Sequence, residues 1–163
     1  MGAKRDAPGT YVLLVCLDRD REIAVGALGR LLFRRGFYLY VGSALGGLRR
    51  RLARHVGMHK RLHWHIDYLL GFATVREIWY REGTERRECG WAQALGGLPG
   101  VEPFGAAFGA SDCSCATHLF YTRLPPDAAG FQWVVGDRLR VERVGVGGGV
   151  DLDGRGRWGD ERE

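Results

Sequence analysis

The amino-acid sequence predicts an α+β domain in which a small mixed or antiparallel sheet is flanked by about three helices, followed by a short C-terminal extension. Three observations support this prediction. The length of 163 residues is that of one ordinary domain. Runs rich in β-branched and aromatic residues fill the first quarter of the chain. Apolar residues then recur at helical spacing in later stretches.

The first quarter of the chain has the pattern of a small β-meander. Strands are predicted at 10–17, 22–25, 31–34 and 37–41. The charged residues at 18–21 and the Arg35-Gly36 pair have the composition of turns between such strands. We therefore expect these four short strands to form the start of the sheet.

Helices and strands alternate in the rest of the domain. Helices are predicted at 47–56, 61–70 and 85–95, and strands at 73–80 and 118–123. Apolar residues spaced three or four apart give the first two helices a face that can pack on a sheet. Thr84 is a suitable N-cap for the third helix, which Gly96 and Gly97 end. The stretch 99–115 is rich in Gly, Ala and Ser, and we expect an ordered loop there.

The expected division is a flexible leader at 1–8, the domain at 9–123, an extension at 124–144 and a Gly-rich charged tail at 145–163. Within the extension, residues 131–144 are predicted to form a hairpin around Gly136 and Asp137. The tail is expected to be partly disordered because it combines glycine with many charges.

The composition favours an anionic partner. The net charge is +5, and all basic residues except Lys4 and Lys60 are arginine. A guanidinium group matches phosphate bidentately, which favours nucleic acid as the partner, although a codon bias would also enrich arginine. The longest apolar run, 12–17, is too short to span a membrane. Four scattered cysteines do not form a disulfide framework, so we expect a soluble protein of the cytoplasm.

Two tyrosine-glycine motifs carry the strongest functional signal. Gly9-Thr-Tyr11 lies on one predicted strand and Tyr40-Val-Gly-Ser-Ala44 on another, followed by Leu48-Arg-Arg-Arg-Leu52 on a helix. This order of tyrosine, glycine, helix leucine and arginine resembles the GIY-YIG nuclease superfamily. The segments 62–69 and 108–119, together with Glu88-Cys89, are similar to a branch of that superfamily that is sometimes joined to endonuclease III-like proteins.

The resemblance implies a metal-dependent endonuclease that acts on nucleic acid, DNA rather than RNA, in repair or processing. Its catalytic residues would be Tyr11 or Tyr40 as the group that deprotonates or orients water, Arg51 at the transition state, and Glu88 as the ligand of Mg2+ or Mn2+. His55 is the alternative base. The residues expected to contact nucleic acid are Gly42, Ser43, Arg49, Arg50, Arg54, Lys60 and His63. A repair protein is a further expected partner.

The residue pattern itself gives physical reasons for some of these roles. Arg51 and His55 border the apolar stripe of the first helix, where a half-sheltered donor can recognise phosphate. The alternative is an arginine whose stem covers the edge of the core. Glu88 shares the apolar face of the third helix, so it needs a cation: a divalent metal ion or a structural partner such as Arg51.

Other polar clusters are expected to be structural. His59, His63 and Asp67 are four residues apart, and we expect a helix pair between His63 and Asp67 rather than a metal site. Trp64 and His65 are interpreted as a packing pair. The segment with Asp112, Cys113, Cys115 and His118 lacks the usual Cys-x2-Cys spacing and offers three good ligands, so a capping loop is favoured over zinc.

Two further hypotheses remain beside the nuclease. A nucleic-acid-binding module with the same fold could keep the basic helix without cutting. A domain that docks onto a repair protein would carry a large exposed apolar patch. The sequence leaves the choice between them, and the oligomeric state, open.

Overall fold

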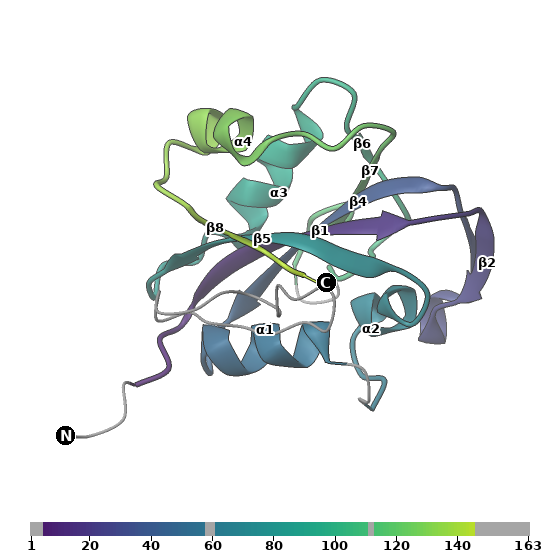
Figure 1. Ribbon diagram of the computed structural model, residues 1–163, viewed down its shortest axis with the longest axis horizontal. Coiled ribbons are helices and arrows are strands. Elements are labelled where there is room, and N and C mark those ends of the chain that lie inside the picture. The colour runs from purple at the N-terminus through teal and green to yellow at the C-terminus, as the bar shows by residue number, and fades with distance from the viewer. Residues whose placement is uncertain (1–4, 58–60, 111–112, 146–163) are drawn as a thin grey trace.

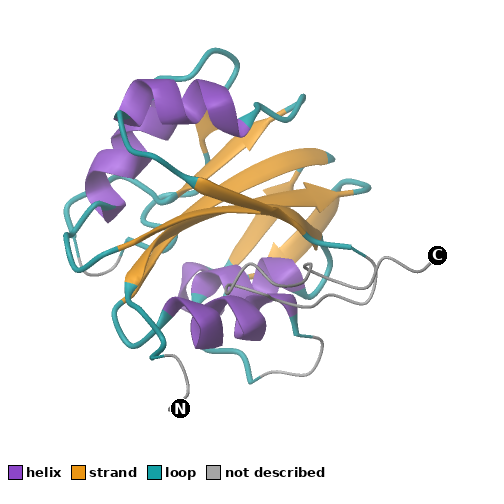
Figure 2. Cartoon of the chain, turned by 60° about the vertical axis from the view of Figure 1, so that its left-hand side comes forward, coloured by secondary structure: helices purple, strands orange, loops and turns teal. Residues whose placement is uncertain are grey.

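The protein is a sheet covered by helices on both faces, as the computed structural model shows for residues 5–57, 61–110 and 113–145 (Figure 1). Six strands pair in the order β6-β7-β4-β1-β5-β8, and every pair is antiparallel. Helices α1 and α2 lie on one face and α3 and α4 on the other (Figure 2). The predicted α+β class with an antiparallel sheet is therefore confirmed.

The strands of the main sheet are β1 (Gly9–Leu17), β4 (Gly36–Ala44), β5 (Thr74–Glu82), β6 (Glu102–Pro103), β7 (Leu119–Thr122) and β8 (Arg140–Arg143). The strands of the small sheet are β2 (Arg21–Ala24) and β3 (Arg30–Phe33). The helices are α1 (Leu48–Val56), α2 (His65–Leu70), α3 (Glu88–Gly96) and α4 (Ala128–Val135), and the short 3-10 helix is η1 (Gly26–Leu28).

Strand β1 lies in the centre of the sheet and separates two apolar cores. Its side chains alternate between the faces. Tyr11 and Leu13 belong to the core under α1 and α2, whereas Val12 and Leu14 belong to the core under α3 and α4. Because β1 is buried on both faces, its sequence is an almost continuous apolar run.

Strand register brings the two tyrosine-glycine motifs together. Tyr11 pairs with Gly42, and Leu13 pairs with Tyr40. The rings of Tyr11 and Tyr40 lie on the same face, with centroids 6.4 Å apart. A Cβ atom at Gly42 would collide with the Tyr11 ring, so the observed position of that ring requires glycine at residue 42. The motifs thus meet at the end of the sheet where α1 begins.

Helix α1 begins beside the N-terminal segment. The Asp6 carboxylate accepts hydrogen bonds from the backbone N–H groups of Arg49 at 2.8 Å and Arg50 at 3.0 Å. An acidic group at this position satisfies free N–H groups and complements the helix dipole. The helix then buries Leu48 and Leu52 against the sheet.

Several local predictions were wrong. The predicted hairpin at 131–144 is the end of α4 followed by β8, because Asp127 caps a helix by accepting from the Gly130 N–H, and Gly136 ends it in the left-handed conformation. Thr84 is not a cap: α3 begins at Glu88 after Arg87. Strands β2 and β3 form their own sheet instead of joining a meander.

The second predicted helix is shorter than expected. It begins at His65 because Asp67 accepts hydrogen bonds from the backbone N–H groups of His63 and Trp64, which ends the irregular segment before it. His59, Lys60, Asp112, the first four residues and the tail from 146 lie outside the described residues. Among the described residues, no helix is long and apolar enough to cross a membrane.

Candidate functional site

The candidate site is a cavity of about 610 Å³, called here the central pocket. It lies where the ends of β4, α1, α2 and α3 meet the loop before β7. Its lining comprises Tyr40, Gly42, Ser43, Leu45, Gly46, Arg51, His63, Trp64, His65, Arg86, Glu88, Cys89, Gly109, Cys113 and His118. Six of the twelve predicted site residues belong to this lining: Tyr40, Gly42, Ser43, Arg51, His63 and Glu88.

Another cavity, of about 750 Å³, lies near the far ends of β1 and β4. It is lined by Cys16, Leu17, Asp18, Arg35, Gly36, Phe37, Arg123 and Leu124. Its lining offers two arginines but no histidine or tyrosine. We place the candidate site in the central pocket because three histidines and Tyr40 line it together with Arg51 and Glu88.

Arg51 is held rigidly on one side of the pocket. Its Nη1 donates to the Ser43 carbonyl oxygen at 2.8 Å, and its guanidinium group lies 4.2 Å from the centre of the Trp64 ring. A stacked and hydrogen-bonded guanidinium keeps its remaining donors in a fixed orientation. We call Tyr40, Ser43, Arg51 and Trp64 the helix wall of the pocket.

Tyr11 and His55 form a buried pair behind this wall. The Tyr11 hydroxyl lies 2.7 Å from His55 Nε2, and both side chains are almost fully buried. Burial raises the pKa of Tyr11 to about 12, although the nearby Arg51 charge opposes the shift. Neither residue lines the pocket, so the expectation that they act directly on a substrate gains no geometric support.

Tyr40 does line the pocket. Burial raises the pKa of its phenol well above the ordinary value, and the neighbouring Tyr11 and Glu88 raise it further. At neutral pH the hydroxyl therefore stays protonated. In this state Tyr40 is a hydrogen-bond donor to a ligand rather than a base.

Glu88 stands at the start of α3 and lines the same pocket as Arg51. One of its carboxylate oxygens lies 2.8 Å from His118 Nδ1. Burial alone would lower the pKa of His118, but the Glu88 carboxylate outweighs it and the pKa is raised. The sequence predicted a cationic partner for Glu88, and in the structure this partner is His118 and not Arg51. Glu88 is also partly exposed rather than buried.

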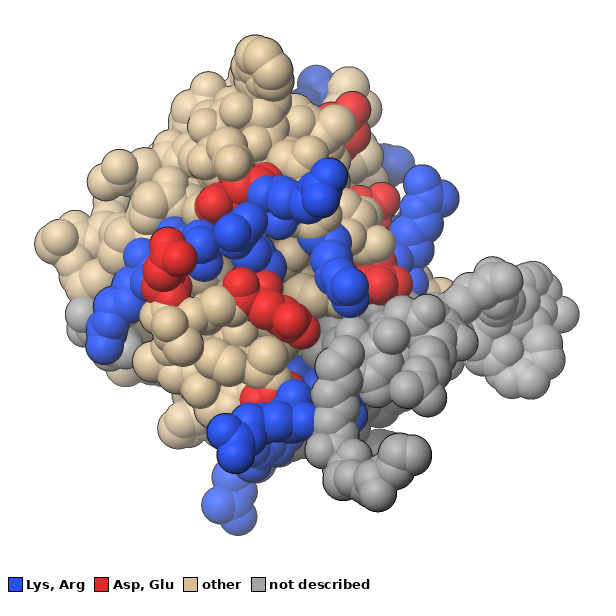
Figure 3. All heavy atoms as spheres, turned by 90° about the vertical axis from the view of Figure 1, so that its left-hand side faces the viewer, with Lys and Arg blue, Asp and Glu red and all other residues tan. Residues whose placement is uncertain are grey.

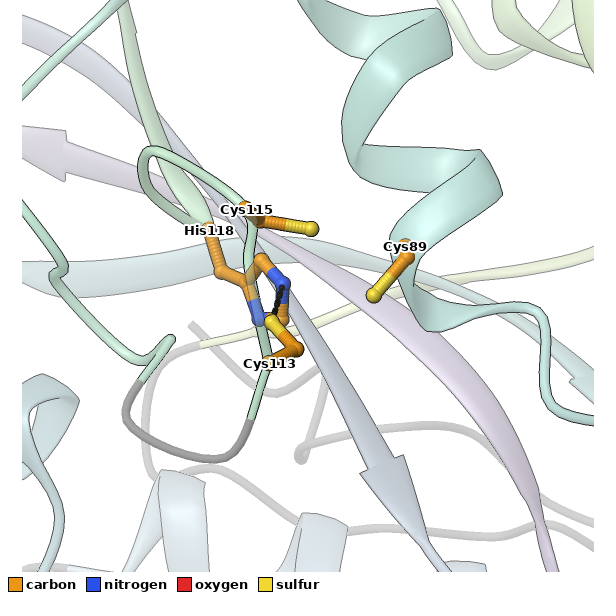
Figure 4. Close-up of side chains that lie close together, drawn as sticks. All are labelled: Cys89, Cys113, Cys115 and His118. Atoms are coloured by element: carbon orange, nitrogen blue, oxygen red, sulfur yellow. Dashed lines mark hydrogen bonds between the residues drawn. The ribbon is translucent and has the colours of Figure 1, made fainter.

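Three cysteines gather beside this pair. Cys89 on α3, Cys113 and Cys115 on the loop before β7, and His118 place their ligand atoms within 4.8 Å of one another (Figure 4). Burial and hydrogen bonds to the other two thiols raise the pKa of Cys115 to about 12. These four residues could hold a metal ion. We call Glu88, Cys89, Cys113 and His118 the loop wall of the pocket.

The sequence favoured a capping loop over zinc for the segment with Cys113, Cys115 and His118, and the structure adds a fourth residue that could bind a metal ion there. The prediction rested on residues 112–118 alone, and these residues include three good metal ligands. The fourth, Cys89, lies more than twenty positions earlier and reaches the cluster because α3 begins beside the loop. The adjacent cysteine in the Glu88-Cys89 pair was the one signal that could have pointed to it.

The predicted contacts to nucleic acid divide into two groups. Gly42, Ser43 and His63 line the pocket. Arg49, Arg50 and Arg54 do not. Arg54 instead donates from both terminal nitrogens to the Asp67 carboxylate, each at 2.9 Å, and Arg50 donates to the Gly46 carbonyl oxygen at 3.1 Å. Arg54 has a structural role because its partner carboxylate is fully buried.

The histidines before α2 differ in their partners. His65 Nδ1 accepts a hydrogen bond from the Gly109 N–H at 2.9 Å, and burial lowers its pKa. His65 therefore fastens the loop before β7 to α2. The predicted side-chain pair of His63 and Asp67 is a bond from the His63 backbone N–H instead, at 2.8 Å. This leaves the His63 ring at the pocket.

The charges on the surface are mixed. Figure 3 shows basic and acidic side chains interspersed on one face, below an area without charged groups. Ion pairs such as Arg34 with Glu102 and Arg30 with Glu22 also neutralise exposed arginines. The excess positive charge of the chain thus does not form one continuous basic surface on the face shown.

A family model matches residues 10–132, and its description is domain of unknown function DUF123. Neither curated proteins nor solved structures gave a significant match. The finding overturns the resemblance to the GIY-YIG superfamily, because the matching family is a distinct domain of unknown function. Since the match covers most of the chain, the protein belongs to the DUF123 family.

Proposed function

We propose that the protein binds the phosphate backbone of a nucleic acid in the central pocket and hydrolyses a phosphodiester bond there. The observation that carries this proposal is the fixed guanidinium of Arg51. It faces a pocket that also holds Arg86, the protonated phenol of Tyr40 and the carboxylate of Glu88. Preoriented donors of this kind stabilise the charge that develops on a phosphoryl group.

Each side chain has a role that follows from its place. Arg51 and Tyr40 donate to the non-bridging phosphate oxygens. Arg86, which also lines the pocket, adds a second positive charge. His63 is an imidazole at the pocket that can accept a proton from water, since Nδ1 of His65 is used by Gly109 and Nδ1 of His118 lies against Glu88.

The metal expected for this reaction is Mg2+ or Mn2+, with Glu88 as its protein ligand. Among the described residues that line the pocket, Glu88 is the one carboxylate. One carboxylate together with substrate phosphates is a sufficient ligand set for Mg2+. The ion would supply a bound water of lowered pKa.

A second candidate function is binding without cleavage. The raised pKa of both tyrosines favours it, because neither phenol can act as a base near neutral pH. The contact of Glu88 with His118 favours it as well, since the carboxylate already has a structural partner.

The test uses labelled single-stranded, duplex, flap and branched DNAs and matching RNAs, with Mg2+, with Mn2+ and with chelator. We expect metal-dependent cutting that Arg51→Ala lowers about 100-fold or more, because it removes a transition-state donor. The matched control is Arg76→Ala, which removes the same charge from an exposed position on β5. It should cut like the wild type.

The possible results separate the candidates. Binding that Arg51→Ala weakens, without cutting under any metal, would replace the hydrolysis proposal by the binding module. A protein that neither binds nor cuts any of these nucleic acids would contradict both. Equal effects of Arg51→Ala and Arg76→Ala would show that the central pocket is not the site.

A further inference from the structure

The cluster of Cys89, Cys113, Cys115 and His118 has dimensions close to those of a bound tetrahedral metal ion. With Zn–S of about 2.3 Å and Zn–N of about 2.0 Å, neighbouring ligand atoms around zinc are roughly 3.6 to 3.8 Å apart. Cys113 Sγ lies 3.4 Å from His118 Nε2, and all four ligand atoms lie within 4.8 Å. Side-chain shifts of about 1 Å would therefore close the set around one ion.

The side chains converge from two separate parts of the chain. Figure 4 shows Cys89 reaching from the first turn of α3 toward the loop that carries the other three residues. The loop backbone is anchored on both sides of the cysteines: the His118 N–H donates to the Phe108 carbonyl oxygen at 2.8 Å, and the Ala107 N–H donates to the Ala116 carbonyl oxygen. The ligand positions are thus largely formed by the fold.

The ligand types select a soft or borderline metal. Three thiolates and one imidazole suit zinc, whereas Mg2+ and Mn2+ prefer oxygen. This cluster is therefore chemically distinct from a magnesium site at Glu88.

Glu88 completes the arrangement from outside. Its carboxylate lies 2.8 Å from Nδ1 of His118, while Nε2 of the same ring faces the Cys113 thiol. A carboxylate behind a metal-bound histidine fixes which ring nitrogen binds the ion and raises its basicity. The Glu88–His118 contact has the order carboxylate, histidine, metal that such sites show.

We propose that Cys89, Cys113, Cys115 and His118 bind one Zn2+ ion in a closed structural site, with Glu88 positioning His118. Four protein ligands leave no open coordination position for a substrate. The ion joins the start of α3 to the loop before β7. It thereby fixes the loop wall of the central pocket without taking part in chemistry there.

The inference does not depend on the proposed function. Cys115 is outside the pocket lining, so its removal tests the metal site with little direct effect on a bound nucleic acid. The assay also contains no nucleic acid. A protein with stoichiometric zinc and no cleavage would overturn only the hydrolysis, and a zinc-free protein that cuts would overturn only the zinc site.

The experiment measures metals by elemental analysis in the full-length chain, purified under reducing conditions from cells supplied with zinc. We expect one zinc per chain in the wild type and in Cys16→Ala, whose half-exposed cysteine lies on β1 outside the cluster. Cys115→Ala should contain nearly none. Circular dichroism identifies any variant that has failed to fold.

A second measurement keeps the test valid if Cys115→Ala does not fold. Zinc-free wild type is titrated with Co2+, and we expect the absorption of tetrahedral Co2+ with thiolate ligands, which added Zn2+ then abolishes. Four results would overturn the proposal: folded wild type without zinc or Co2+ binding, full zinc content in Cys115→Ala, iron in place of zinc, or a disulfide between two of the cluster cysteines in metal-free protein.

Discussion

The two walls of the central pocket are built in different ways. The helix wall rests on regular elements, with Leu48 and Leu52 of α1 buried against the sheet and Arg51 locked between them and Trp64. The loop wall consists of the first turn of α3 and an irregular loop, and the contact between Glu88 and His118 joins these two parts. Apolar burial can fix the first wall, whereas the second needs a link between its two parts.

The largest expected effect comes from removing the apolar support of the helix wall. Leu52 is fully buried, so Leu52→Ala should lower the free energy of unfolding by about 2–5 kcal/mol. Chemical denaturation measures this change. Leu124→Ala is the matched control, because Leu124 is 78% exposed and its truncation should change stability by less than about 0.5 kcal/mol. Similar losses in both variants would show that α1 is not fixed by burial.

The second-largest effect on stability is expected at Asp67, the buried carboxylate that accepts hydrogen bonds from the segment containing Trp64. Asp67 accepts from Arg54 and from two backbone N–H groups, and Asp67→Asn should cost about 3 kcal/mol because Arg54 loses its charged partner. The exposed Asp18→Asn should cost almost nothing. Denaturation at neutral pH compares the two variants.

The same carboxylate predicts a pH dependence. Burial raises the pKa of Asp67, but the hydrogen bonds from Arg54, Trp64 and His63 outweigh it, so the pKa is lowered below its ordinary value. The stabilisation is therefore present above about pH 4 and is lost as the pH falls through the lowered pKa. Asp67→Asn should show a smaller loss of stability on acidification, and an unchanged acid limb would contradict this assignment.

The smallest effect on folding is expected at the loop wall. Glu88→Gln keeps the shape of the side chain but removes the charge behind His118, so we expect Zn2+ affinity to fall about 10–100-fold. Competition with a chromophoric chelator measures it. Glu85→Gln, three residues earlier and 76% exposed, should bind zinc as tightly as the wild type. Equal affinities in all three proteins would mean that Glu88 does not position His118.

The two walls also differ in how far the sequence predicted them. Local periodicity placed Arg51 and His55 at the border of the apolar stripe of α1. Arg51 is half-buried as expected, whereas His55 is almost fully buried and belongs to the stripe itself. Strand patterns likewise located β1, β4 and β5 to within a few residues. These features depend on residues that are close together in the sequence, so the spacing of apolar residues predicts them.

The loop wall depends on contacts between distant residues. No periodicity relates Cys89 to Cys113, so the fourth ligand was missed, and the partner of Glu88 was named as an arginine or a metal ion rather than His118. The position of α4 was missed for a different reason. This helix has only eight residues, most of them apolar, and the Gly136-Asp137 pair that follows it resembles a hairpin turn. In the structure, Gly136 instead ends the helix.

The central place of β1 has a consequence for synthesis of the chain. This strand leaves the ribosome before both of its partners, β4 and the much later β5, in which Glu82 pairs with Gly9. At about 5–20 residues per second, β1 waits roughly 4–15 s before the second partner is made. During that interval the edge that later pairs with β5 stays open along the apolar run, which exposes nascent β1 to aggregation.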